Sequence, residues 1–258
     1  MEYLPDQLLK EFLDEKYDQY DRPEFIETDP IQIPHSYTLP EDIEISGFLT
    51  STIAWGQRKS IIVNAHKLMH LMGNSPYDFV INASDSQLGK LKYFVHRTFQ
   101  GDDCLFFIQS LKNIYKKYNG LGRFFESGYL KHRDIAMTLV SFRKVFFEID
   151  CFPRTFKHIS DINKGASAKR LNMFLRWMVR DDKRGVDFGL WKSIPASALY
   201  IPIDLHTGNV ARKLGLLLRK QNDWKAVAEL TTRLREFDPL DPVKYDFALF
   251  GLGIFDKF

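Results

Sequence analysis

The segment NKGASAKRLNMFLRWMVR, residues 163–180, contains a glycine turn followed by a helical pattern whose first turn carries Lys169 and Arg170. Backbone N–H groups at a helix start bind anions, and glycine lets a phosphate approach closely, so Gly165 and Ser167 (the expected N-cap) are candidate contacts. The positive end of a helix disfavours an ammonium ion, and a neutral lysine amine is a nucleophile. The pattern predicts either a reactive Lys169 or an ordinary helix start.

The segment YIPIDLHTGNVARKLGLL, residues 200–217, brings a carboxylate to the start of another helical pattern. Asp204 follows an apolar approach that contains a proline. Its simplest role is that of a helix N-cap, which contributes about 1 kcal/mol. In a cleft, the same carboxylate would deprotonate a nucleophile or stabilise a developing cation. Spacing alone favours the cap.

The formal net charge of +3 hides an uneven distribution along the chain. Residues 1–50 carry 3 basic and 13 acidic side chains, whereas residues 151–220 carry 14 basic and 5 acidic ones. A basic segment in a nearly neutral protein indicates a local anionic partner, with nucleic-acid phosphate the leading candidate. The alternative is that the acidic N-terminal segment balances the basic one within the fold.

Two further groups of acidic side chains lie outside the Lys169 and Asp204 segments, and each could have a structural role. One group of charged residues has two equally favoured roles, a buried Arg–Asp network or substrate recognition, and a metal site is disfavoured for it. The group consists of Arg176, Arg180, Asp181, Asp182 and Asp187. Near the C-terminus, helix capping and anchoring to the core are expected of Asp238, Asp241 and Asp246.

Cysteine content and hydropathy exclude several classes of protein. The two cysteines, Cys104 and Cys151, fit no metal-ligand spacing, which excludes a disulfide framework and a four-cysteine iron–sulfur cluster. No cofactor is implied. The N-terminus lacks the basic start of a signal peptide, and no stretch approaches the roughly 18 apolar residues of a membrane span. We expect a cytoplasmic protein that does not enter the membrane.

Helical periodicity dominates, and it predicts an all-α fold. We expect one unit without a flexible linker, made of an acidic helix and connector (1–40), a helical lobe (41–150) and a second lobe (151–258). Asp223 and Asp241 are candidate caps. Residues 29–40, with three prolines, read as an extended connector. Helices are expected over 41–73 (a pair), 85–99, 102–120, 132–150, 167–182, 204–217, 223–237 and 241–255.

The stretch ALYIPIDLHTGNVARKLGL, residues 198–216, resembles the helix-hairpin-helix DNA glycosylase superfamily, and most closely its archaeal 8-oxoguanine glycosylase branch. The resemblance implies that Asp204 is catalytic, and His206 and Arg212 match the same stretch. GASAKRLNMFLRWM resembles the second half of the hairpin, where bifunctional members place their lysine, here Lys169.

The chain as a whole resembles an uncharacterised bacterial family related to that superfamily, through FLTSTIAWGQRK, KRLNMFLRWMVR, IPIDLHT and DPVKYDFALFGLG. Two features depart from the superfamily. The Gly-x-Gly before the lysine reads Gly165-Ala166-Ser167-Ala168, and the separation between Lys169 and Asp204 is longer than in endonuclease III-like members. Lys164 is the fallback nucleophile.

The resemblance implies a monomeric DNA glycosylase, with or without AP-lyase activity, that acts on a damaged base flipped from double-stranded DNA. Trp55, Gln57 and His206 would line the base pocket, with Trp191 a further candidate and Trp177 assigned to the core. Alternatives are a non-catalytic helix-hairpin-helix protein that binds nucleic acid and an enzyme acting on RNA or a modified nucleotide. Contacts to the DNA backbone would come from Gly165, Ser167, Arg170, Arg58, Lys59 and Arg212.

Overall fold

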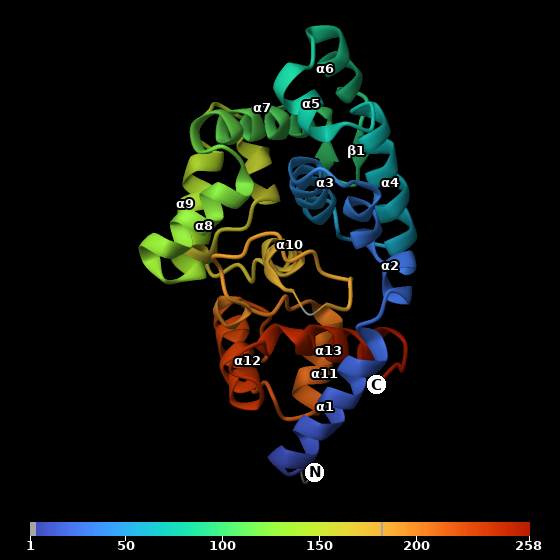
Figure 1. Ribbon diagram of the computed structural model, residues 1–258, viewed down its shortest axis with the longest axis vertical. Coiled ribbons are helices and arrows are strands. Elements are labelled where there is room, and N and C mark those ends of the chain that lie inside the picture. Colours follow the sequence, from blue (N-terminus) through green and yellow to red (C-terminus); the bar gives the residue numbers. More distant parts are fainter. Residues whose placement is uncertain (1–3, 182) are drawn as a thin grey trace. The chain divides into compact units, whose positions relative to one another are not determined.

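The computed structural model describes residues 4–181 and 183–258, and its regular structure is almost entirely helical (Figure 1). The fold is all-α, as the periodicity predicts. Contacts divide the chain into two units, one made of the residues up to Phe25 with Asp161–Phe258, the other of Ile26–Ser160. None of the helices in the described residues has the length and apolar content that crossing a membrane requires.

The first unit is built around α13 (Tyr245–Ile254), whose sequence YDFALFGLGI is apolar on nearly every side. Helix α1 (Asp6–Tyr20) packs along α13, and α11 (Leu205–Lys213) packs against it as well (Figure 1). Gly251 lets the ring of Tyr20 lie directly on α13, since a Cβ there would be 2.1 Å from that ring. The other elements are η4 (Ile162–Lys164), α10 (Lys169–Val179), η5 (Ala196–Ala198), α12 (Trp224–Phe237) and η6 (Pro242–Lys244).

The second unit has an aromatic core in which Phe48, Phe107, Phe142 and Phe146 contact one another. The chain passes from the first unit into the second within α2 (Glu24–Thr28). The elements that follow are η1 (Pro30–Gln32), η2 (Pro34–Ser36), α3 (Pro40–Thr52), α4 (Arg58–Leu71), α5 (Pro76–Asn82), α6 (Asp85–Leu91), β1 (Val95–His96), β2 (Phe99–Gln100), α7 (Gly101–Tyr118), α8 (Leu121–His132), α9 (Ile135–Phe146) and η3 (Pro153–His158).

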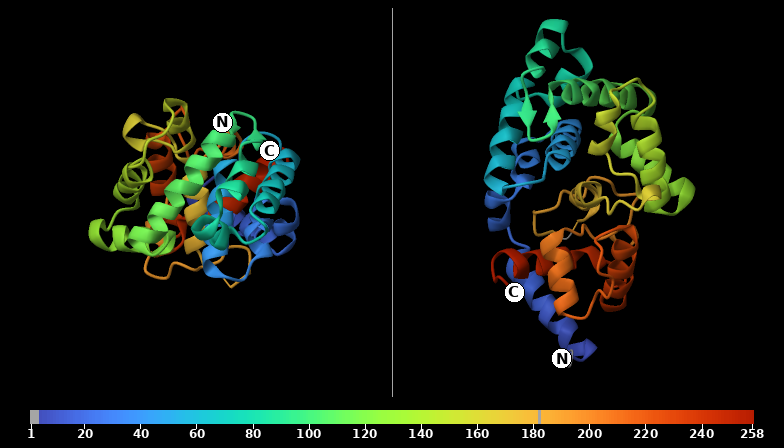
Figure 2. Two further views of the ribbon diagram at one scale, coloured as in Figure 1. Left: turned by 90° about the horizontal axis from the view of Figure 1, so that it is seen from above. Right: turned by 180° about the vertical axis from the view of Figure 1, so that it is seen from behind.

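Two segments of this unit differ from the sequence prediction. The proline-rich connector is not extended, because Pro30 and Pro34 each begin a short 3₁₀ helix. The helix expected over 85–99 ends at Leu91, and a small antiparallel hairpin follows, with Val95 opposite Gln100 (Figure 2). Phe94, His96 and Phe99 are buried whereas Tyr93, Val95 and Arg97 are exposed, which is the two-residue period of a strand.

The helix caps agree with the predictions in part. Asp204 and Asp223 accept N–H groups of α11 and α12, as expected. Ser167 is not the N-cap of α10, because Ala168 takes that position in a left-handed conformation (φ +51°) with no side-chain cap. Asp241 precedes η6 but makes no side-chain cap to it; its carboxylate binds Arg180 instead.

Candidate functional site

Lys169 is the first residue of α10, and the turn before it is fixed by the backbone. Gly165 has φ +83°, a left-handed conformation that favours glycine, and its carbonyl accepts the N–H of Trp224 at 3.0 Å. The N–H of Ala166 donates to the carbonyl of Asp161 at 3.1 Å. These bonds join the turn to the start of α12, so the starting point of α10 is held in place.

Asp204 uses its two carboxylate oxygens for two purposes. Oδ1 accepts the N–H of Thr207 at 2.9 Å and caps α11, while Oδ2 lies 3.8 Å from the Nζ of Lys169. Asn222 donates to the backbone carbonyl of Asp204 at 3.0 Å, which fixes this residue further. The Lys169 and Asp204 side chains are 27% and 23% exposed, so both keep contact with solvent. The cap and a carboxylate facing an amine are therefore compatible roles of one residue.

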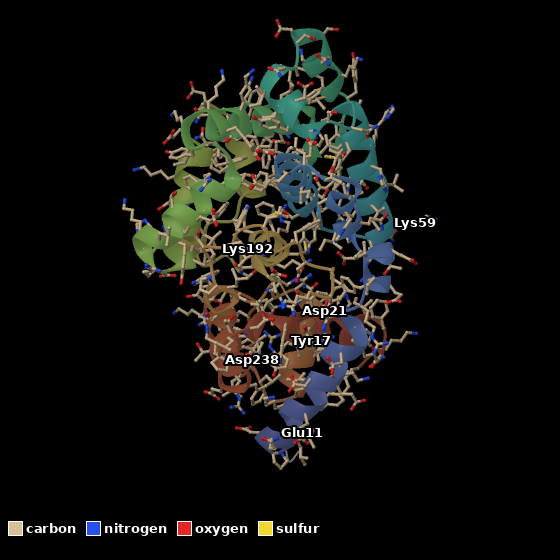
Figure 3. All side chains as sticks on the ribbon, viewed as in Figure 1. Glu11, Tyr17, Asp21, Lys59, Lys192 and Asp238 are labelled. Carbon is tan, nitrogen blue, oxygen red and sulfur yellow. The ribbon has the colours of Figure 1, made fainter. Side chains whose placement is uncertain are left out.

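A buried Arg–Asp network begins two turns along α10. Arg180, 1% exposed, pairs with Asp241 at 2.7 Å, with Asp21 at 3.0 Å and with Asp187 at 3.2 Å. It also donates to the Tyr17 hydroxyl at 2.6 Å; Figure 3 labels Tyr17 of α1 and Asp21, the residue that follows this helix. Burial disfavours the charge on Arg180, but Asp187, Asp241 and Asp21 outweigh it, so its pKa is raised. Of the five side chains for which a network or substrate recognition was predicted, Arg176, Arg180 and Asp187 join the network, whereas the exposed Asp181 pairs with Lys192 at 2.5 Å.

Arg176 links this network to α13. Its Nε lies 3.3 Å from Asp187 and its Nη1 lies 2.5 Å from Asp246. Burial raises the pKa of Asp246 to about 6; Arg176 and Lys169 oppose the rise, and Asp204 adds to it. The sequence analysis assigned Asp246 to helix capping or to anchoring the C-terminus. A single acidic residue in an otherwise apolar helix was the signal that could have indicated a buried ion pair.

His206 and Arg212 lie on α11, beyond Asp204. A hollow of about 270 Å³ is lined by residues of α11 that include His206, Asn209 and Lys213, and by Gly253 and Phe258. Arg212 also borders it, but its Nε donates to the carbonyl of Arg219 at 2.7 Å and its Nη2 to Asn222 at 2.6 Å. Arg212 was predicted to contact a phosphate, but two of its guanidinium nitrogens already donate hydrogen bonds within the first unit.

Four of the predicted contact residues lie in the second unit, where α3 ends and α4 begins. Trp55 is half-buried, with its ring edge-on to His96 at 5.1 Å, and its carbonyl is 3.2 Å from the Nε2 of His96. Gln57 is exposed, Arg58 is partly buried and Lys59 is exposed, as Figure 3 shows for Lys59. Sequence reasoning missed Arg97, whose guanidinium covers Gly56 so closely that a Cβ there would lie 2.5 Å from its Nη1.

Other predicted residues have more restricted surroundings. Trp177 is fully buried, as expected. Trp191 is 2% exposed and packs edge-on to Phe174, so its ring packs in the core. Arg170 is partly buried, and this burial lowers the pKa of its guanidinium to about 10. Asp182 lies outside the described residues.

The basic segment is balanced in part within the first unit. Arg180 pairs with Asp21, and Arg184 pairs with Asp18 at 2.6 Å, so two of its arginines bind acids of the N-terminal segment. These two pairs support the alternative that the acidic N-terminal segment balances part of the basic segment within the fold. Across residues 4–181 and 183–258, no group of three or more His, Cys, Asp or Glu side chains is arranged to hold a metal ion.

Comparisons with known proteins identify the family of the chain but no function. Neither a curated protein nor a solved structure gives a match. A family described as a protein of unknown function, DUF2400, matches residues 29–255, which is most of the sequence. The chain belongs to this family of unknown function, DUF2400.

Proposed function

We propose that the chain is a DNA base-excision glycosylase of the helix-hairpin-helix kind, with Lys169 as the amine nucleophile and Asp204 as its partner. The observation that carries the proposal is the 3.8 Å separation between Lys169 Nζ and Asp204 Oδ2 at two helix starts, with both side chains partly exposed. An amine open to a ligand, beside a carboxylate that can accept its proton, fits the pairing of a nucleophile with a general base.

The turn at 165–168 supports the hairpin assignment in part. It precedes α10 and presents a left-handed glycine, as a backbone-binding turn does. The element before the turn is the three-residue 3₁₀ helix η4, which is shorter than the first α-helix of a full hairpin. The proposed fold relationship therefore rests on the second half of the motif and on Asp204.

The chemistry begins with transfer of a proton from Lys169 to Asp204 Oδ2, which frees the lone pair on Nζ. Nζ then bonds to C1′ of the deoxyribose as the bond from C1′ to the base breaks, and the base nitrogen takes the electron pair and the proton held by Asp204. Asp204 next takes a proton from the new C1′–N ammonium and passes it to O4′ as the C1′–O4′ bond breaks, which leaves a protonated imine between Lys169 and C1′. Loss of a proton from C2′ and departure of the 3′ phosphate would complete a lyase step.

Within the same proposal, Trp55 and Gln57 of the second unit and His206 of the first unit are separate candidates for contact with a base. Trp55 is half-buried, and stacking of a base on an aromatic ring contributes about 1–3 kcal/mol. In the first unit, backbone contacts are assigned to the turn, Arg170 and Arg212; in the second unit, Arg58 and Lys59 at the start of α4 are separate candidates. An 8-oxoguanine-like lesion in duplex DNA is the substrate class that this proposal names.

Borohydride trapping tests the proposal directly. Duplex oligonucleotides that carry either 8-oxoguanine or an abasic site are incubated with the protein and reduced, and the covalent adduct is located by peptide mass spectrometry. We expect an adduct on Lys169 and a loss of at least about 100-fold in trapping for Lys169→Ala, the lower range for a lost acid–base or nucleophilic group.

Lys164→Ala is the matched control, because Lys164 is an exposed lysine on the neighbouring η4. An adduct on Lys164 would move the nucleophile by five residues. A protein that binds the DNA with steep salt dependence but forms no adduct and releases no base would be a non-catalytic binding protein, and the enzyme proposal would be withdrawn.

A further inference from the structure

The hollow beside α11 lies within the first unit, and the proposed chemistry at Lys169 and Asp204 does not use it. Its volume is about 270 Å³, and its walls come from α11, from Gly253 of α13 and from Phe258. At position 253, a Cβ would lie 3.1 Å from the Cβ of His206 and 3.3 Å from Cγ2 of Val210. Glycine therefore lets α13 approach α11 closely here, and the hollow borders a tightly packed junction of the two helices.

Three side chains of α11 bring hydrogen-bond donors to this hollow. His206, Asn209 and Lys213 are exposed, and their spacing of three and four residues places them on one face of the helix. An imidazole, a carboxamide and an ammonium group each carry at least one N–H donor. A ligand in the hollow would therefore meet a row of donors, one of which is always charged at neutral pH.

The walls of the hollow carry positive charge and no acidic side chain. None of the residues that line it is an aspartate or a glutamate. Among residues 4–181 and 183–258, no carboxylate lies within 4.0 Å of Lys213 or Arg212. Lys213 lies 5.6 Å from the ring centroid of Phe258, and Arg212 donates to two neutral acceptors, the Arg219 carbonyl and the Asn222 side chain. Neither cation is neutralised by these contacts.

The end of α11 explains only part of this arrangement. The helix dipole favours cations in a last turn, where Arg212 and Lys213 lie. It does not explain why the cations border a hollow whose walls carry further donors. The acids next to the lining segments in the sequence are paired elsewhere, Asp204 with Lys169 at 3.8 Å and Asp256 with Lys16 at 2.7 Å. The positive charge at the hollow is therefore available to an anion.

We propose that this hollow binds a phosphate group, with His206, Asn209 and Lys213 as donors and Arg212 as a further positive charge. Lysine and asparagine are common partners of nucleic-acid phosphates, and a cleft with charge of one sign concentrates counter-ions. Pockets for drug-sized ligands measure about 300–1,000 Å³, so this smaller hollow suits one phosphate with part of its sugar.

The inference rests on the proposed function for the source of the phosphate, which is the DNA backbone. It gives His206 a more specific role than contact with a base, and it adds Asn209 and Lys213 to the residues that meet the strand. A free phosphate compound offers the same chemistry, and separate experiments distinguish the two sources.

Inorganic phosphate tests the hollow without DNA. The full-length ¹⁵N-labelled protein is titrated with phosphate at constant ionic strength, with chloride as the reference salt, and backbone amide shifts are followed by NMR. We expect saturable shifts at Asn209, Lys213 and Gly253. Lys213→Met removes a cation, and Asn209→Asp places an anion of the same shape in the hollow. Each should weaken phosphate binding by about two- to fivefold, the range of an exposed ion pair.

Lys220→Met is the matched control, because Lys220 is an exposed lysine of the same unit that does not line the hollow. It should leave phosphate binding unchanged. Since Asn209 and Lys213 are exposed, both test variants should fold. If phosphate gives no saturable shifts, or if neither test variant changes its affinity, the proposal is overturned.

DNA binding identifies the source of the phosphate. The affinity for an 8-oxoguanine duplex is measured by fluorescence anisotropy at several salt concentrations. A backbone contact predicts that Lys213→Met lowers the slope of log K against log salt by about 0.9 in magnitude, and that Lys220→Met leaves it unchanged. An unchanged slope in Lys213→Met, together with binding of inorganic phosphate, would overturn the DNA source and assign the hollow to a free phosphate compound.

Borohydride trapping separates this inference from the proposed function. If the protein forms no adduct but Lys213→Met lowers the salt slope, base excision fails and the phosphate site stands. If an adduct forms on Lys169 and inorganic phosphate does not bind, the inference alone fails.

Discussion

Basic side chains at the two ends of α10 pair with aspartates in two ways, which differ in burial and in the distance between the charged groups. Arg176 and Arg180 are buried, and their guanidinium groups lie 2.5–3.3 Å from their carboxylates. Lys169 lies at the start of the same helix, keeps 27% of its side chain exposed, and is 3.8 Å from Asp204. The same residue types thus form a closed network at one end of α10 and an open pair at the other.

The difference shows why burial and spacing must be read together. A guanidinium with several carboxylates at hydrogen-bonding distance is saturated, and it has little left to offer a ligand. An amine that touches one carboxylate loosely can exchange that contact for a substrate. A network of arginines and aspartates is therefore weak evidence for a site, whereas the looser pair at the helix start is the better candidate.

The largest expected effect comes from opening the buried network. Arg180→Ala leaves Asp21, Asp187 and Asp241 without their shared guanidinium, and removal of one partner of a buried ion pair costs about 3–5 kcal/mol. The free energy of unfolding, measured by urea denaturation, should fall by that amount.

A surface pair in the same unit provides the control. Arg184 and Asp18 are 34% and 62% exposed, so Arg184→Ala should lower the free energy of unfolding by only about 0–1 kcal/mol. Equal losses in Arg180→Ala and Arg184→Ala would contradict the view that the network stabilises the unit through burial.

The next effect is the pH dependence that Asp246 adds to stability. Its pKa is about 6 in the folded protein against an ordinary 3.8, so the folded state holds this proton more tightly than the unfolded chain. That contribution to stability is complete below about pH 4 and is lost as the pH rises through 6. At about 1.36 kcal/mol per unit, the loss is on the order of 2–3 kcal/mol.

Asp246→Asn removes this titration while keeping the shape of the side chain. Between pH 4 and pH 7, the unfolding free energy of the wild type should fall relative to that of the variant, whatever constant offset the loss of the Arg176 pair adds. Parallel curves for the two proteins over this range would show that Asp246 titrates normally.

A smaller effect separates the two oxygens of Asp204. Asp204→Ser keeps an oxygen for the Thr207 N–H but removes the carboxylate that faces Lys169, whereas Asp204→Ala removes both. Ala should cost about 1 kcal/mol of stability and Ser only a few tenths, because serine is a good N-cap. Trapping should fall about 100-fold in both variants. Undiminished trapping in Asp204→Ser would leave Asp204 as a cap alone.

The sequence predicted the parts of the fold that depend on local pattern. Apolar residues at helical spacing located α7, α9 and α12, and the Asp204 and Asp223 caps follow from residue type and position. The same approach placed Lys169 at a helix start, because a glycine turn before an amphipathic run is a local signal.

What the sequence could not supply was long-range pairing and backbone conformation. Asp246 meets Arg176 across 70 positions of the chain, and no spacing rule connects them. Ala168 replaced Ser167 as the cap because the chain enters α10 through a left-handed residue, which residue preference does not foresee. The hairpin at 95–100 was hidden because four paired residues are too few to show a period in a helical context.

The expected change in stability for Lys169→Met is also small, and its smallness is informative. A partly exposed pair at 3.8 Å contributes about 0–1 kcal/mol, since water competes for both charges, and methionine keeps most of the aliphatic stem of lysine. The unfolding free energy should therefore stay within about 1 kcal/mol of wild type while trapping is lost. A loss of 3 kcal/mol or more would place Lys169 with Arg176 and Arg180 as part of the structural network, and the contrast between the two ends of α10 would disappear.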